Sequence, residues 1–374
     1  MFAPLSIPSP SSDWKAFDVA QWLRDIGLTW FDFPFTIHAY AICILVGIIA
    51  ATILTSLRLK RRGADPGVVL DIALWAVPFG IIGGRIFHVL THPDDYFFAG
   101  ADLMKTLYIW EGGMAIFGAL ILGAVGTYIG CRMAGVRFWS FADALAPGLL
   151  LAQASGRLGN YFNQELFGLP TDLPWGLVID SPNPALPVGL PDGTLFHPTF
   201  LYEILWNLLG VAVLLLAERK FRRGTTDIRG ITVPVLVPVS TRLEWGKLLG
   251  LYLIWYGAGR SVFESIRIDP SEIFLGVRTN VWAALAAIVV GLLIIIVQGR
   301  RHPGLEPSPY LPGHEWSPEA GVDSDETYSD SDDDDADDDV IVVAKKSGRD
   351  SSGRDSADSD KAKEPATSGV GAKA

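Results

Sequence analysis

Residues 281–298 read VWAALAAIVVGLLIIIVQ, a run of eighteen residues without a charged side chain. The hydrocarbon core of a bilayer is about 30 Å thick, and about 20 mostly apolar residues in a helix span it. This stretch therefore predicts a transmembrane helix. The rest of the chain contains six more long apolar stretches, and together they give seven predicted spans: 35–57, 67–90, 113–131, 139–157, 198–217, 246–266 and 281–298.

The composition supports a membrane protein and excludes some other classes. The chain has 374 residues, of which 49% are hydrophobic, and a net charge of −11. Residues 303–374 contain 19 acidic and 7 basic side chains, which leaves 22 acidic and 23 basic ones in the remainder. The acidity therefore belongs to the C-terminal end, and no basic domain points to nucleic acid. Cys43 and Cys131 lie far apart in sequence, which does not indicate a disulfide framework or a metal site.

The basic residues between the apolar stretches predict the orientation, because cytoplasmic loops are rich in lysine and arginine. One set of loops contains 15 such residues: Arg58, Lys60, Arg61, Arg62, Arg132, Arg137, Arg219, Lys220, Arg222, Arg223, Arg229, Arg242, Lys247, Arg300 and Arg301. The opposite set contains five: Lys15, Arg24, Lys105, Arg267 and Arg278. The first set is therefore predicted to be cytoplasmic, with the N-terminus outside and the C-terminus inside.

These observations predict an all-α polytopic membrane protein with seven transmembrane helices in residues 35–299. Residues 1–34 lack the basic start and small-residue cleavage site of a usual signal peptide and form an expected extracytoplasmic segment. Residues 300–374 are predicted to be an acidic cytoplasmic tail, disordered from 303 onward because it contains too few apolar residues to bury. The apolar but short segment Ile231–Val239 is interpreted as part of a cytoplasmic loop, with a re-entrant or surface segment as the alternative.

The stretch from Gly156 to Glu165, GRLGNYFNQE, carries unusual polarity for the end of an apolar span. A charged residue at membrane depth costs at least about 2.5–3.5 kcal/mol on insertion scales. An arginine, two asparagines and a glutamate placed there indicate a site better than they indicate packing. In the predicted topology, Arg157 and Asn160 lie where span four leaves the membrane on the outer side.

A second group of polar residues lies in span six at helical spacing. Tyr256, Arg260 and Glu264 are four residues apart, and Arg267 follows three residues later, so all four share one stripe of a helix. Two arginines at the outer level, Arg157 and Arg260, favour an anionic ligand, since a guanidinium binds phosphate through two hydrogen bonds. The alternative is an Arg260–Glu264 pair that only neutralises itself.

The start of other spans brings further polar residues to the same outer level. His197 and Glu203 lie where span five begins, and Tyr40 follows His38 at the start of span one. His197 has the alternative of capping or orienting its helix. Tyr40 has the alternative of an aromatic anchor at the membrane surface. Asp71 and Asp143 lie near the predicted cytoplasmic ends, where structural pairing is expected.

The quoted motifs resemble those of the bacterial prolipoprotein diacylglyceryl transferase family. The family signature G-R-x-G-N-(F/Y)-x-N-x-E matches residues 156–165 throughout, and it is long and specific. The resemblance covers about residues 35–299, apart from an insertion at 220–245. It is also carried by four shorter runs: Ile37-His38-Ala39-Tyr40, Trp110-Glu111-Gly112-Gly113, residues 197–203 (HPTFLYE), and Tyr256-Gly257 with Arg260, Glu264 and Arg267.

The resemblance implies transfer of the diacylglyceryl group of phosphatidylglycerol to the lipobox cysteine thiol in the signal peptide of a preprolipoprotein, with release of glycerol phosphate. It implies the bacterial inner membrane, with membrane lipids as surroundings. The predicted topology places the active site toward the outer leaflet, and the absence of a metal or cofactor motif indicates that neither is needed. The catalytic candidates are Arg157, Arg260, His197 and Tyr40. The substrate-binding candidates are Arg157, Asn160, Glu165, Gly168, Tyr256, Arg260, Glu264 and Glu203.

One position departs from the family pattern. Many members carry a histidine shortly after the W-x-G-G turn, and here the aligned residue is Phe117. We therefore expect two arginine side chains to stabilise the leaving phosphate and to favour the thiolate, with His197, Tyr40 or Glu203 as possible proton relays. Two other classes remain open from the residues: a transporter or flippase with an anionic lipid site, and a non-catalytic lipid-binding scaffold.

Overall fold

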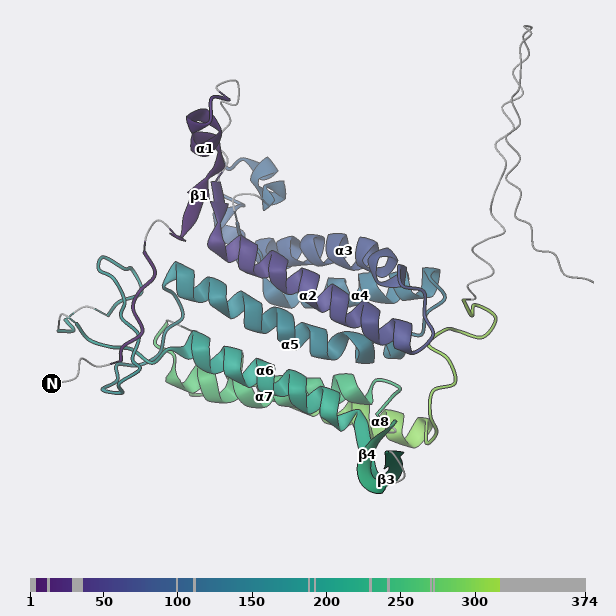
Figure 1. The fold of residues 1–374 in the computed structure, drawn as a ribbon. Helices are drawn as coiled ribbons and strands as arrows, with labels where there is room; N and C mark the ends of the chain where they lie inside the picture. The colour runs from purple at the N-terminus through teal and green to yellow at the C-terminus, as the bar shows by residue number, and fades with distance from the viewer. Residues whose placement is uncertain are drawn as a thin grey trace, which may run out of the picture. The chain divides into compact units, whose positions relative to one another are not determined.

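The computed structural model of the chain describes residues 5–11, 14–28, 36–98, 100–109, 112–187, 189–191, 193–228, 231–240, 243–269, 271 and 273–316. Within these residues, seven long helices overlap the seven predicted spans (Figure 1). They are α2 (Ala39–Arg61), α3 (Val68–Thr91), α4 (Ile116–Met133), α5 (Phe138–Asn163), α6 (Thr199–Ala217), α7 (Lys247–Ile266) and α8 (Thr279–Arg301). The chain thus has the helical architecture expected of a polytopic membrane protein.

Five of these helices, α2, α3, α4, α6 and α8, are long and apolar enough to cross a bilayer. Helices α5 and α7 are less apolar because they carry the polar residues of the motifs. Helix α5 packs against α2, α6 and α7, so its polar side chains have protein rather than lipid as neighbours. Among its buried residues are Asp143 and Asn160.

The ends of α2 and α5 show the largest differences from the predicted spans. Helix α2 begins at Ala39 and not at residue 35, because Thr36–His38 forms strand β2, which pairs with β1 (Ala16–Asp18) ahead of the short helix α1 (Val19–Asp25). Helix α5 continues to Asn163, six residues beyond its predicted end at Arg157. It stops at Gln164, whose φ of 52° is left-handed and incompatible with another helical turn.

Small residues allow the closest helix contacts. Helix α3 packs on α4, and a Cβ added to Gly118 would lie 2.1 Å from the carbonyl oxygen of Gly83. Likewise, a Cβ added to Gly83 would lie 2.3 Å from the carbonyl oxygen of Gly118. The glycines of α4 thus let it pack closely against α3.

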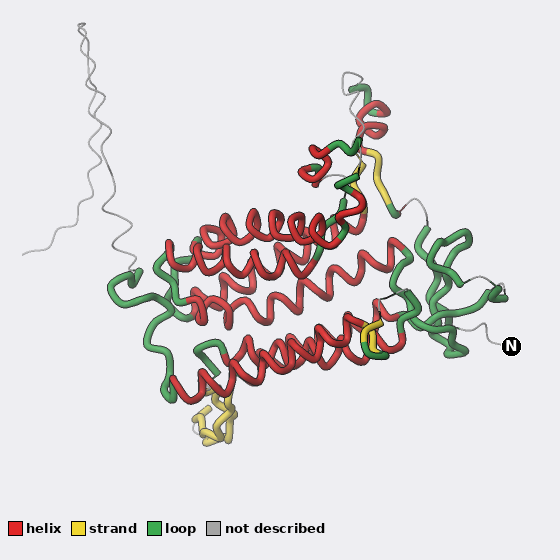
Figure 2. Tube along the Cα trace, turned by 180° about the vertical axis from the view of Figure 1, so that it is seen from behind, coloured by secondary structure: helices red, strands yellow, loops and turns green. Residues whose placement is uncertain are grey.

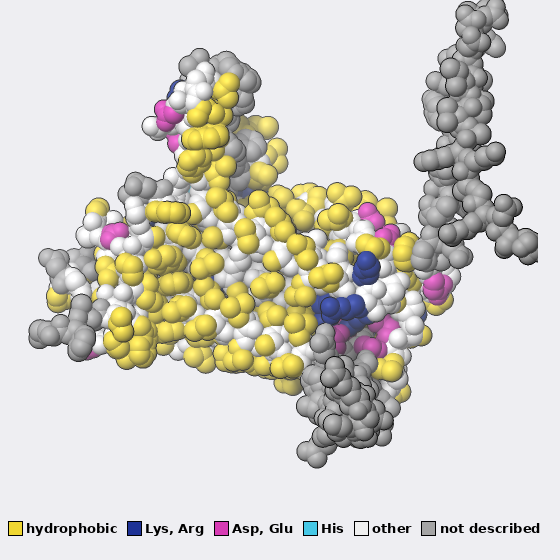
Figure 3. Space-filling model, viewed as in Figure 1, with side chains coloured by type: hydrophobic (Ala, Val, Ile, Leu, Met, Phe, Trp, Pro, Cys, Tyr) yellow, Lys and Arg dark blue, Asp and Glu magenta, His cyan; other side chains and the backbone are white. Residues whose placement is uncertain are grey.

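The outer surface of the helices is apolar, as Figure 3 shows for one face. Exposed side chains include Leu45 on α2, Leu74 on α3 and Leu293 on α8, at 57%, 73% and 53% exposure. A soluble monomer rarely exposes an apolar patch of more than a few hundred Å². The exposed surface of the helices therefore suits lipid as its surroundings.

Ion pairs and a helix cap stabilise the end of the helix bundle where α2 and α6 finish. Arg58 and Arg62 of α2 contact the carboxylate of Glu218, just after α6, at 2.5 and 2.9 Å. Asp143 of α5 accepts hydrogen bonds from the backbone N–H groups of Gly246 and Leu249 at 2.7 and 2.9 Å. This capping of α7 confirms the structural role predicted for Asp143.

The segment Ile231–Val239 is not an irregular loop. Strands β3 (Arg219–Ile228) and β4 (Ile231–Ser240) form an antiparallel hairpin, in which Arg219 pairs with Ser240 and Ile228 with Ile231 (Figure 2). Prolines are tolerated in such a strand because both strands of a two-stranded hairpin are edges. The remaining short elements are η2 (Pro93–Asp95), η3 (Leu103–Leu107), β5 (Ile273–Phe274) and β6 (Val277–Arg278).

The predicted disorder from residue 303 onward is wrong for residues 303–316, which we call, with His302, the C-terminal strap (302–316). Tyr310 is 4% exposed and belongs to a core that includes Leu59, Ile72 and Phe141. Its hydroxyl accepts the backbone N–H of Asp65 at 2.9 Å. The low apolar content of the whole tail concealed this one buried aromatic residue. Residues 317–374, the rest of the predicted tail, lie outside the described residues.

Candidate active site

Arg157 and Glu203 form the centre of the polar cluster predicted from the sequence. Arg157 lies near the end of α5 and Glu203 in the first turns of α6, and Arg157 Nε is 2.8 Å from Glu203 Oε2. The Arg157 side chain is 21% exposed and that of Glu203 only 7%. Because so little water reaches this ion pair, the attraction between its two charges is screened weakly.

Arg157 also begins a chain of hydrogen bonds through the GRLGNYFNQE motif. Its Nη1 donates to Asn160 Oδ1 at 3.1 Å, and Asn160 Nδ2 donates to Glu165 Oε1 at 2.8 Å. Asn163 Nδ2 donates to the same Glu165 oxygen at 3.2 Å. The two asparagines and the glutamate therefore fix the turn after α5 and hold one edge of the Arg157 guanidinium.

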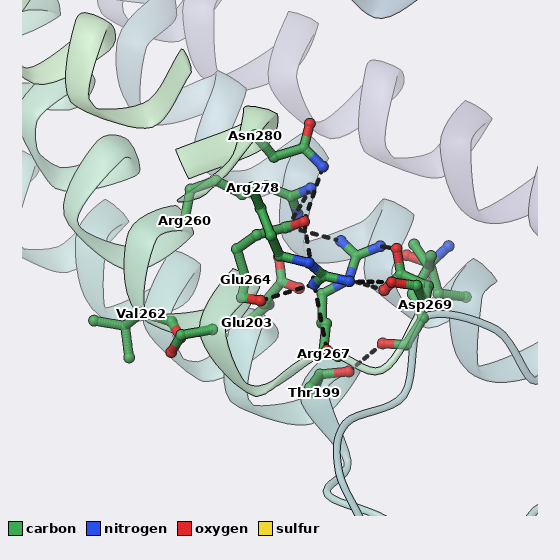
Figure 4. A network of polar contacts seen from close by, with 12 residues as sticks. Thr199, Glu203, Arg260, Val262, Glu264, Arg267, Asp269, Arg278 and Asn280 are labelled. Carbon is green, nitrogen blue, oxygen red and sulfur yellow. Dashed lines mark hydrogen bonds and ion pairs between the residues drawn. The ribbon is translucent and has the colours of Figure 1, made fainter. Parts of the chain in front are cut away.

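Glu264 on α7 is the centre of the second cluster, which Figure 4 shows from close by. Its side chain is fully buried and lies 2.9 Å from Arg260 Nη2, 3.5 Å from Arg267 Nη1 and 3.4 Å from Arg278 Nη1. Asn280 Nδ2 donates to Glu264 Oε1 at 2.9 Å. One carboxylate thus gathers three arginines and an amide from α7, β6 and α8.

The Arg260–Glu264 pair that was weighed as an alternative does exist, but its geometry leaves Arg260 loosely held. Glu264 Oε2 receives no aligned hydrogen bond in the described part of the chain, although Arg260 and Arg267 lie within ion-pair distance of it. The Arg260 side chain is 15% exposed. Within the described part of the chain, Arg260 is therefore positioned by charge and not by an aligned hydrogen bond to Glu264.

Arg267 links the loop between α5 and α6 to α7. Its Nε and Nη2 donate to the two oxygens of Asp269 at 2.7 and 2.9 Å. Its backbone forms a bridge with Gly168. A Cβ at Gly168 would lie 2.7 Å from the Cβ of His197 and 3.0 Å from the carbonyl oxygen of Ile266. Gly168 is needed here because three chain segments converge at one point.

His197 lies beside this convergence rather than on an arginine. Its Nδ1 is 3.2 Å from the hydroxyl of Tyr202, which in turn accepts a hydrogen bond from Trp175 Nε1 at 3.0 Å. Its backbone carbonyl accepts the N–H of Gly168 at 2.9 Å. Among the described residues His197 forms no ion pair. Its hydrogen bonds instead hold the loop that borders the cluster.

The two predicted tyrosines lie on helices that border the cluster. The Tyr40 ring packs onto Gly159, where an added Cβ would lie 2.4 Å from the ring, two residues from Arg157. Tyr256 stacks on Tyr252 with ring centroids 6.1 Å apart and lies close enough to Arg157 to interact with it electrostatically.

Several polar or motif residues do not join the cluster. Arg85 donates to backbone carbonyls of Lys105, Thr106, Gly112 and Gly113 and so holds the loop before α4. His88 stacks on His92. Phe117 packs against Phe87 of α3, with ring centroids 6.2 Å apart. Trp110 and Glu111 lie outside the described residues.

The sequence interpretation missed Arg278, Asn280 and Asp269. Arg278 had been counted only as a loop charge, yet its Nη1 also donates to the backbone carbonyl of Glu264 at 2.9 Å. The one sequence feature that points to this role is that Arg278 directly precedes a predicted span, at the same predicted membrane depth as Glu264. In the described part of the chain, no three His, Cys, Asp or Glu side chains gather as metal ligands would.

The fold and the site define a helical, membrane-embedded protein with an arginine–carboxylate cluster at the end of the bundle where α5 and α7 finish. A family model described as prolipoprotein diacylglyceryl transferase matches residues 28–297. The chain belongs to this family of transferases.

Curated relatives carry the same description. A phosphatidylglycerol–prolipoprotein diacylglyceryl transferase of Leifsonia xyli is 58% identical over 330 residues, which cover 86% of this chain and 90% of the relative. Proteins of that name from Streptomyces coelicolor (the second such protein there) and Mycobacteroides abscessus are 44% and 43% identical. Those alignments cover 73% and 72% of this chain, and 79% and 77% of the relatives.

Proposed function

We propose that this protein transfers the diacylglyceryl group of phosphatidylglycerol to the cysteine thiol in the lipobox of a preprolipoprotein signal peptide, and that glycerol phosphate leaves. The observation that carries the proposal is the pair of partly exposed arginines, Arg157 and Arg260, which lie within electrostatic range of each other in a family of this activity. They lie in an otherwise apolar bundle, where isolated charges are costly.

The available hydrogen-bond donors support a phosphate site. Arg157 Nε forms the ion pair with Glu203, and Nη1 donates a hydrogen bond to Asn160. Among the described residues, Nη2 has no partner. Arg260 contacts Glu264 through Nη2 alone. Guanidinium groups bind phosphate oxygens through paired, charge-assisted hydrogen bonds. The two side chains together therefore offer several donors to one phosphodiester.

The reaction places negative charge where these donors lie. The sulfur forms a bond to the glyceryl carbon next to the phosphate, the bond from this carbon to the phosphate oxygen breaks, and the oxygen keeps the electron pair. Donors aimed at charge that develops in the transition state are typically the largest single contribution to a rate. The arginines also favour the thiolate over the thiol, since a nearby cation lowers a thiol pKa.

The other motif residues support the two arginines. Asn160 and Glu165 hold the guanidinium of Arg157 and the turn that follows it, and Glu264 orients Arg260. Gly168 allows the outer loop to approach α7, and Tyr40 and Tyr256 border the headgroup site. His197 sets the loop through Gly168 and Tyr202.

We infer that all seven long helices span the bacterial inner membrane, with the N-terminus outside and the cluster near the outer leaflet. The basic residues of the opposite end and the apolar outer surface support this orientation. A thiol-reactive, membrane-impermeant label tests it. A cysteine introduced at Leu190, in the outer loop, is expected to react in intact cells, and one introduced at Arg132 is not.

The proposed function is tested with purified protein, radiolabelled phosphatidylglycerol and a lipobox peptide. We expect label on the peptide and glycerol phosphate in solution, and no label on a peptide in which serine replaces the cysteine. Well-folded protein that binds the lipid and transfers nothing would reject the proposal in favour of a transporter or a scaffold.

A further inference from the structure

Glu203 differs from the other carboxylates of the cluster in how it is held. The ion pair with Arg157 is its one recorded polar contact among the described residues, and its side chain is 7% exposed. Glu264 is surrounded by three arginines and an amide. Asp269 receives two hydrogen bonds from Arg267. Glu203 therefore keeps the most oxygen lone pairs without a donor.

The remaining candidates for a proton acceptor are less suitable. Glu165 accepts hydrogen bonds from both Asn160 and Asn163 through one oxygen and fixes the turn after α5. His197 contacts the Tyr202 hydroxyl and, among the described residues, neither Arg157 nor Arg260. Phe117 has no proton-accepting atom and packs on Phe87. An acceptor for the thiol proton is nevertheless required.

We propose that Glu203 is the general base that takes the proton from the attacking cysteine thiol, an inference that rests on the proposed transferase function. The S–H proton moves to a Glu203 oxygen while sulfur forms its bond to the glyceryl carbon. The bond from that carbon to the phosphate oxygen breaks, and its electron pair leaves with glycerol phosphate. Glu203 then returns the proton to the released phosphate, whose second pKa is about 6.

The Arg157 guanidinium supports this assignment because it brings base and phosphate together. Nε faces Glu203, and Nη2, on the same edge of the group, has no partner among the described residues and is left for the phosphate. One guanidinium therefore holds Glu203 next to the phosphate and so next to the glyceryl carbon that the sulfur attacks.

Glu203 lies among cationic side chains. It faces Arg157 from α5, and Arg260 and Tyr256 of α7 and Arg267, directly after α7, lie within electrostatic range of that arginine. These cations stabilise the negative charge as it passes from the carboxylate to the sulfur and on to the leaving phosphate.

The test compares Glu203→Gln with wild type on two peptides, one with the lipobox cysteine and one with selenocysteine, which is already ionised at neutral pH. General-base catalysis contributes about 10²–10⁴-fold. We expect Glu203→Gln to lose about that factor on the thiol peptide, and to recover to within a few-fold of wild type on the selenol peptide.

A pH profile provides the second readout. The Glu203→Gln rate on the thiol peptide is expected to rise about tenfold per pH unit toward the thiol pKa of about 8.5, whereas the wild-type rate levels off earlier. Binding of phosphatidylglycerol vesicles confirms folding. If the variant does not fold, Glu203→Asp provides the comparison, because it shortens the base and is expected to slow the thiol reaction only.

Two results would overturn the assignment. One is a Glu203→Gln enzyme with an unchanged rate and pH profile on the thiol peptide. The other is an equal loss on both peptides, which identifies Glu203 as a residue that only positions Arg157. A wild-type protein that labels neither peptide rejects the transferase function itself, so the two failures are distinguishable.

Discussion

The carboxylate of Asp143 on α5 caps the beginning of α7 at Gly246, at a distance of 2.7 Å. The backbone N–H groups in the first turn of a helix have no intrahelical partner, and Asp143 satisfies two of them, at Gly246 and Leu249. Because α5 and α7 carry Arg157 and Arg260 at their other ends, this contact helps to set the relative height of the two arginines.

Replacement of Asp143 by alanine is expected to lower stability by more than about 1 kcal/mol, since loss of a helix cap costs about 0.5–2 kcal/mol and the two N–H groups stay buried. Thermal unfolding in detergent measures the change. Asp71→Ala, which removes an exposed carboxylate from the first turn of α3, is the matched control and should leave the melting temperature nearly unchanged.

Lysine at position 157 or 260 keeps the charge but removes the flat, two-donor geometry that binds phosphate. We expect transfer to fall by about 10²–10³-fold in either variant, the range observed for loss of one preorganised donor. Arg132→Lys, an exposed arginine at the end of α4, serves as control and keeps full activity. Near-normal transfer by Arg157→Lys or Arg260→Lys would contradict the phosphate-binding role.

Alanine at Gly168 would place a Cβ 2.7 Å from His197 Cβ and 3.0 Å from a backbone carbonyl oxygen. The loop between α5 and α6 must then move away from α7, and we expect transfer to be lost while the helices remain folded. Gly299→Ala is the control, because nothing lies within 4 Å of its added Cβ. Circular dichroism and the transfer assay separate the two effects, and an active Gly168→Ala enzyme would show that the close approach is dispensable.

Truncation tests the C-terminal strap. A chain that ends after residue 316 should unfold at the same temperature as the full protein, whereas one that ends after Arg301 loses Tyr310 and its contacts. Loss of a buried aromatic side chain typically costs about 3–5 kcal/mol. Tyr310→Phe removes only the hydrogen bond to Asp65, for an expected loss of about 1 kcal/mol. Equal unfolding temperatures for both truncations would contradict this role.

The pair of arginines at Glu218 predicts a loss of stability in acid. Burial tends to raise the pKa of Glu218, but Arg58 and Arg62 outweigh burial and hold that pKa below its usual 4.5. A carboxyl with a lowered pKa stabilises the fold above its unfolded pKa, and this contribution disappears as the pH falls through the folded pKa. The difference in the free energy of unfolding between pH 7 and a pH below 4.5 should therefore be smaller for Glu218→Gln than for wild type.

Much of the architecture could be predicted because the bilayer imposes a simple length rule. The hydropathy of residues 281–298 alone predicts a span, and helix α8 covers that stretch. The GRLGNYFNQE motif likewise marked Arg157, Asn160 and Glu165 as site residues, since polar groups are rare at that depth. Their mutual hydrogen bonds are consistent with this interpretation.

Other features depended on contacts between distant segments. Sequence spacing suggested that Arg260 pairs with Glu264, but it did not reveal that Arg278 and Asn280 of the following elements share the same carboxylate. Tyr310 was hidden in an acidic tail because average composition dilutes a single buried aromatic residue. The apolar segment Ile231–Val239 is too short to predict a span, but only the structure shows that it pairs with the preceding segment as a hairpin.

The sequence by itself determined where the chain enters lipid and which polar residues remain at the helix ends, because burial in a bilayer depends on the run of apolar residues along one segment. Only the tertiary structure decided that Arg157 takes Glu203 as its partner and that Glu264 holds three arginines. Ion pairing depends on distances of a few Å between different helices, and those distances are set by how α5, α6, α7 and α8 pack.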